Sequence, residues 1–131
     1  MFDTNVLLAA FLTEGICAKL LSRARKRHFD LFLCPHILKE FRQVLGKKFL
    51  GTQDEIDSAE ALLLEAGSVS AAPEFAAPDI CRDPDDNHVL AGARAASTDY
   101  LVTGDLDLLI LGHFEGIQII SPRDFEARMA D

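Results

Sequence analysis

The chain has 131 residues, 49% hydrophobic and 26% charged, which is typical of one globular domain with a buried core. No apolar run approaches the roughly 20 residues of a membrane-spanning helix, and the first residues lack the basic and apolar regions of a signal peptide, so we expect a single cytoplasmic domain over residues 1–131. The net charge of −8 argues against a polyanionic partner unless bound cations offset it.

Apolar stretches alternate with helical patterns along the chain, which is typical of an α/β domain with a largely parallel sheet. The first predicted elements are a short strand over residues 1–3, helices over 7–12 and 16–27, and a buried strand over 30–34. Pro35 opens a third helix, on which Glu40 lies just beyond the apolar stripe. An acid in that position is expected to face a cleft beside the core.

A fourth helix is predicted from its end signals. Thr52 and Glu55 have the spacing of a capping box, and Gly67 is expected to end the helix. The later predicted elements are a small strand around Val69, an Ala/Pro linker over 71–78, strands over Tyr100–Val102 and Ile117–Ile120, and a closing helix over Pro122–Met129.

Three acids stand at the start of another predicted helix. Asp83 suits its N-cap. Asp86 falls in the first turn and shares a helix face with Val89 and Leu90, so its side chain is expected to point over the sheet. Acids in a first turn also favour the helix dipole, and Asp83 and Asp85 qualify for that role as well. We favour Asp86 as the functional acid because of its apolar neighbours.

Acids also follow two of the predicted strands. Asp3 ends the first strand, and Asp105 and Asp107 come after the strand over Tyr100–Val102. Ligands of parallel sheets bind outside the carboxyl ends of the strands. Two like charges about 4 Å apart repel by about 4 kcal/mol at an effective dielectric near 20, so converging acids either bind a divalent cation or stay protonated. The alternatives without a functional role are that Asp3 only caps a helix and that Asp105 and Asp107 belong to an ordinary turn.

Other residue types carry weaker signals. The histidines share no metal-ligand spacing, which disfavours a zinc site, and hard carboxylate ligands suit Mg²⁺ or Mn²⁺. We expect Cys17, Cys34 and Cys81 to be buried, reduced thiols. Basic residues cluster between Lys19 and His28, where they fit the C-terminal end of a helix dipole better than a substrate site.

Four segments, in this order and spacing, resemble the PIN-domain family of metal-dependent nucleases. They are the Asp-Thr-Asn opening, a Glu in the helix after the second strand, an Asp that opens an apolar helix, and Thr-x-Asp after an apolar strand. The similarity covers nearly the whole chain and implies a three-layer α/β/α sandwich with a central, largely parallel sheet. It assigns the catalytic, metal-binding acids to Asp3, Glu40, Asp86 and Asp105, with Asp107 as a further ligand and Asn5 and Thr103 as supports.

The resemblance is strongest to small prokaryotic PIN proteins that are toxins of toxin–antitoxin pairs. It implies a Mg²⁺- or Mn²⁺-dependent endoribonuclease with an RNA substrate, an antitoxin protein as partner, and a homodimeric state. The alternative is a catalytically degenerate PIN fold that binds RNA or protein. A phosphatase of the haloacid dehalogenase type is disfavoured because Asn5 stands where a second Asp is needed, and a receiver-like signalling domain because no Lys follows Thr103.

Overall fold

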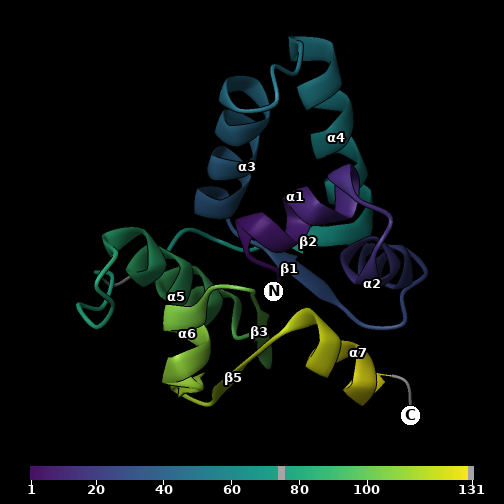
Figure 1. Ribbon diagram of the computed structural model, residues 1–131. Coiled ribbons are helices and arrows are strands. Elements are labelled where there is room, and N and C mark those ends of the chain that lie inside the picture. Colours follow the sequence, from purple (N-terminus) through teal and green to yellow (C-terminus); the bar gives the residue numbers. More distant parts are fainter. Residues whose placement is uncertain (74–75, 130–131) are drawn as a thin grey trace.

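Short strands alternate with helices throughout the computed structural model, which describes residues 1–73 and 76–129 (Figure 1). The helices are α1 (Thr4–Leu12), α2 (Ile16–Arg25), α3 (Pro35–Lys47), α4 (Gln53–Ala66), α5 (Pro84–Ala96), α6 (Leu106–Leu111) and α7 (Pro122–Met129). The strands are β1 (Leu31–Leu33), β2 (Gly67–Val69), β3 (Tyr100–Val102), β4 (His113–Phe114) and β5 (Ile117–Ile120).

Most strand pairs in the described residues are parallel. β1 pairs with β2, and β3 pairs with β5, both in parallel, whereas β4 lies antiparallel to β5. Residues 1–3 run alongside β3: the carbonyl of Met1 accepts a hydrogen bond from Val102 N at 2.8 Å, and Asp3 N donates to Val102 O at 3.1 Å. The predicted α/β class with parallel strands is therefore confirmed, and the antiparallel β4 is an addition to it.

Several predicted elements are confirmed to the residue. β3, β5 and α7 have the predicted bounds, and the capping box forms, with Glu55 N donating to Thr52 Oγ1 at 3.1 Å and Thr52 N to Glu55 Oε1 at 3.0 Å. The first helix begins at Thr4 and not at residue 7, because Asp3 caps it. α6 and β4 were not predicted. The described part of the predicted linker over 71–78 has no helix or strand, and its residues 74–75 lie outside the described chain.

The core consists of the apolar faces of the helices packed on the strands. Leu7 of α1, Leu20 of α2, Phe41 of α3 and Leu90 of α5 are fully buried there, together with Leu101 of β3. No single helix among the described residues has the length and hydropathy to cross a bilayer; α1 and α2 pass that test only as a pair, and they are bent by 97° where they meet.

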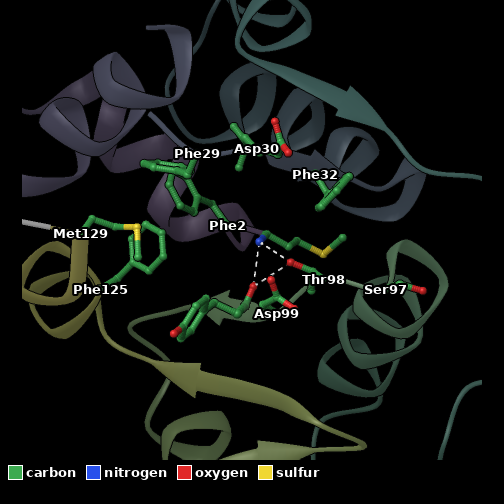
Figure 2. Close-up of a pocket in the computed structure, with 12 residues that line it drawn as sticks. Phe2, Phe29, Asp30, Phe32, Ser97, Thr98, Asp99, Phe125 and Met129 are labelled. Atoms are coloured by element: carbon green, nitrogen blue, oxygen red, sulfur yellow. Dashed lines mark hydrogen bonds between the residues drawn. The ribbon is translucent and has the colours of Figure 1, made fainter. Parts of the chain in front are cut away.

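An aromatic cluster holds the N-terminal segment in place. Phe2 packs edge-on against Phe125, with ring centroids 6.0 Å apart, and Phe125 also packs against Phe29 at 5.0 Å. Beside the cluster lies a cavity of about 350 Å³, where the Met1 amino group donates hydrogen bonds to Tyr100 O at 2.7 Å and Thr98 Oγ1 at 3.1 Å (Figure 2). These contacts fix residues 1–3 against β3 and so determine where the side chain of Asp3 lies.

The three cysteines have no disulfide partner, as predicted, but only Cys34 is buried, and Cys17 and Cys81 are half-buried. Cys34 is the residue before α3, and it packs against Gly92 of α5. A Cβ atom at Gly92 would lie 2.7 Å from Cys34 Sγ and 3.0 Å from Cys34 Cβ. The absence of a side chain at residue 92 therefore allows α5 to approach the start of α3.

We predict that Gly92→Ala destabilises the chain by about 1–3 kcal/mol, the usual cost of an overpacked core site, although alanine is the better helix former. The matched control is Gly46→Ala in α3, where the new Cβ would approach nothing closer than Ile56 Cδ1 at 3.4 Å. Urea unfolding should show the loss for Gly92→Ala alone, and the loss should shrink in a Cys34→Ala background. Equal effects at the two glycines would contradict the close-approach explanation.

Candidate metal centre

Asp3 is buried at the carboxyl end of the N-terminal segment, with 6% of its surface exposed. One carboxylate oxygen accepts a hydrogen bond from Val6 N at 3.0 Å and so caps α1, and the other accepts one from the hydroxyl of Thr103. Burial raises the pKa of Asp3, even though these two donors favour its ionised form. Asp3 therefore does cap a helix, and this capping fixes a carboxylate at the strand end.

Asp105 occupies the equivalent place after β3. Its Oδ1 atom caps α6 by accepting hydrogen bonds from Asp107 N at 2.9 Å and Leu108 N at 3.2 Å. Its own backbone N–H donates to Thr103 Oγ1 at 3.0 Å, and Thr103 is fully buried. Thr103 thus contacts both strand-end acids and sets their spacing, although nearly the whole chain separates Asp3 from Asp105.

Asp86 points into the same space from the first turn of α5 and is 7% exposed. Burial, and then the negative charge of Asp105, raises its pKa to about 6. Oxygen atoms of Asp86, Asp105 and Asp107 lie within 4.8 Å of one another, which is close enough for one cation to contact all three. Asp107 also accepts hydrogen bonds from Arg82 at 2.9 and 3.0 Å.

Glu40 belongs to a second group of ligand atoms on the other wall. Thr4 donates its hydroxyl hydrogen bond to Glu40 Oε1, and His36 Nε2 lies 2.7 Å from Asp85 Oδ1. Burial and a hydrogen bond with Asp85 raise the pKa of Glu40. Burial acts against ionisation of Asp85 too, but its hydrogen bonds with Glu40 and His36 prevail and lower its pKa. The two side chains therefore share a hydrogen bond in which the raised pKa of Glu40 favours Glu40 as the donor.

Both groups contribute acids to the lining of one cavity of about 160 Å³. Its walls come from the starts of α1, α5 and α6 and from one side of α3, and the acids that line it are Asp3, Glu40, Asp83, Asp85, Asp86 and Asp105. Six carboxylates in so small a space, with the pKa raised for Asp3, Glu40 and Asp86, are a donor set suited to a hard divalent cation. The residues present therefore fit Mg²⁺ or Mn²⁺.

The structure brings together every acid singled out from the sequence. Asp3, Glu40, Asp86 and Asp105 line the cavity, Asp107 lies beside Asp86 and Asp105, and the supports Asn5 and Thr103 lie next to them. Sequence reasoning missed His36 and Asp85. His36 stands four residues before Glu40 on α3, a spacing that puts the two side chains on one helix face and was the available signal.

The basic cluster lies elsewhere and has structural contacts. Arg27 donates hydrogen bonds to Ala66 O and Glu65 O, both at 2.9 Å, and Arg23 donates to Met129 O at 2.6 Å. Arg23 and Arg25 lie in the last turn of α2, as expected for cations at the negative end of a helix dipole. These contacts support the structural interpretation of the cluster.

The family comparison agrees with this geometry. A family model described as "PIN domain" matches residues 1–107, a span that includes all of the acids described above. The chain therefore belongs to the PIN-domain family. PIN domains are in general nucleases that use divalent metal ions, so the fold of this chain is of the nuclease type. A search of curated proteins gave no match to the sequence.

The raised pKa of Asp86 predicts how stability without metal depends on pH. In the folded chain Asp86 ionises near pH 6, and its ordinary pKa is 3.8. The folded state therefore binds more protons between these values, so this group lowers the free energy of unfolding as the pH rises from about 4 to about 6.

An asparagine at residue 86 cannot titrate, and the described structure gives Asp86 no side-chain hydrogen bond to lose. We expect Asp86→Asn, unfolded by urea in EDTA, to be more stable than the natural chain by about 2 kcal/mol at pH 7 and by little at about pH 4. An advantage of the same size at both pH values would show that Asp86 is not under electrostatic strain.

Proposed function

We propose that this chain is a Mg²⁺- or Mn²⁺-dependent endoribonuclease in which Asp3, Glu40, Asp86, Asp105 and Asp107 hold the cation. The proposal rests on one observation: carboxylate oxygens of Asp86, Asp105 and Asp107 lie within 4.8 Å of one another, beside the buried Asp3. Family membership supports phosphodiester hydrolysis as the chemistry.

The protein residues have separate tasks in this proposal. Thr103 and the first turn of α1 hold Asp3 rigidly, and the cap on α6 engages one oxygen of Asp105 and leaves the other for a cation. Asp86 extends into the cavity from a helix start, and its raised pKa shows that a negative charge there is costly, so a cation would be held by it as an ionised ligand. A cation bound there supplies Lewis-acid activation of water and offsets negative charge on the phosphodiester.

RNA is the proposed substrate, and its preference over DNA must come from binding, because metal-assisted hydrolysis needs no 2′-hydroxyl. The net charge of −8 disfavours RNA binding over the chain as a whole. At the site this repulsion is smaller, because each divalent cation neutralises two of the acids that would repel a phosphate. We further propose, on family resemblance alone, a cytoplasmic toxin that forms a homodimer and is paired with an antitoxin protein.

The second candidate function is a degenerate PIN fold that binds RNA or protein without cleaving it. One observation favours it: the Arg82 guanidinium contacts both oxygens of Asp107, so a protein cation already neutralises part of the acidic group. A catalytic centre requires Asp107 to leave Arg82 or to contribute little to cation binding.

The experiment that separates these functions is cleavage of a mixed pool of RNAs in Mg²⁺, Mn²⁺ or EDTA. The natural chain should cleave only with a divalent cation, and Asp105→Asn should lose cleavage by about 100-fold or more while remaining folded, since asparagine also caps helices well. Asp124→Asn on the exposed face of α7 is the matched control and should cleave normally. Undiminished cleavage by Asp105→Asn, or cleavage in EDTA, would refute the assignment.

A further inference from the structure

A groove extends from the acidic cavity along the seam between α1 and α3. It has a volume of about 460 Å³ and shares Asn5 and Val44 with the wall of the cavity. On the α1 side it follows one helix face through Leu8 to Leu12, a length of about 10 Å from Asn5 at 1.5 Å per residue. The groove is thus a continuation of the candidate catalytic cavity.

The far end of the groove combines an aromatic ring with a cation. Phe49, just after α3, lines it and is 51% exposed, and Lys48, its neighbour in the chain, lines the same groove. A ring next to an ammonium group is the pair that binds a base by stacking and the adjoining phosphate by charge.

The basic residues near the end of α3 differ in their ion pairs. Arg42, one turn back on α3, is engaged with Asp57 and Glu60. Among the described residues, Lys47 and Lys48 have no acidic group within 4.0 Å. Lys48 is thus an unpaired cation at the end of a groove whose other end opens on a proposed phosphodiesterase centre, which is charge complementarity toward a polyanion.

We propose that this groove is a nucleotide subsite: a base of single-stranded RNA stacks on Phe49, Lys48 contacts the neighbouring phosphate, and the strand continues past Asn5 to the carboxylates. The inference rests on the proposed nuclease function and adds to it a binding subsite for one nucleotide, away from the carboxylates. Single-stranded RNA is specified because a ring can stack only on a base that is not already stacked within a duplex.

The test uses the absence of tryptophan from this chain. Phe49→Trp places a lone fluorophore in the groove, and Leu64→Trp places one at a similarly exposed residue of α4, where Leu64 is 46% exposed. Each variant is titrated in EDTA with a single-stranded RNA about eight nucleotides long and with a duplex of the same sequence. The proposal predicts saturable quenching of Phe49→Trp by the single strand, weaker quenching by the duplex, and none in Leu64→Trp.

A second measurement compares affinities. Phe49→Ala should weaken binding of the single-stranded RNA about tenfold, the size expected for loss of one base–aromatic stack, and Phe49→Tyr should restore it. Both measurements are made without a divalent cation, so they report RNA binding and not cleavage. A chain that fails to cleave RNA can therefore still show stacking on residue 49, and the two proposals are tested separately.

Two results would overturn the proposal. One is the absence of quenching in Phe49→Trp, or quenching of the same size in Phe49→Trp and Leu64→Trp. The other is a change of oligomeric state in Phe49→Ala, measured by light scattering, with unchanged RNA affinity. That second result would assign the groove to contact between copies of the chain.

Discussion

Mutual repulsion of carboxylates in a small cavity is the constraint on which the rest of the structure depends. Asp3, Asp86 and Asp105 reach this cavity from three separate elements. Asp3 and Asp86 are buried and Asp105 is half-buried, which is costly without a compensating positive charge or proton. The raised pKa values of Asp3, Glu40 and Asp86 are the direct expression of that cost. A hard cation removes it, which connects the fold to a chemical activity.

The scaffold keeps the acids together by means that resist their repulsion. Helix caps engage one oxygen each of Asp3 and Asp105, and Thr103 hydrogen-bonds to the side chain of one and the backbone of the other. On the opposite wall, Glu40 and Asp85 are joined by a hydrogen bond, and His36 Nε2 contacts Asp85 Oδ1. The close contact of Gly92 with Cys34 sets the approach of α5 to α3, the helices that carry the two walls.

Local signals in the sequence were enough to predict most of the fold and the main acids. Asp3 and Asp105 follow strands, Asp86 shares a face with buried leucine and valine, and Thr52 with Glu55 marks a helix start; each depends only on neighbours in the chain. The bridge from Thr103 to Asp3 and the contact of His36 with Asp85 join residues far apart in sequence, and no local spacing reports such pairs. β4 was missed because two residues are too short for a periodicity to appear.

Proton release on metal binding tests the central claim most directly. If a cation relieves the repulsion, Mn²⁺ binding must displace the proton that Asp86, with a pKa of about 6, holds on part of the molecules near that pH. Titration calorimetry at about pH 6, in buffers that differ in ionisation enthalpy, should show proton release that falls at about pH 8 and is reduced in Asp86→Asn. Absence of Mn²⁺ binding, or binding with no proton release at the lower pH, would contradict the account.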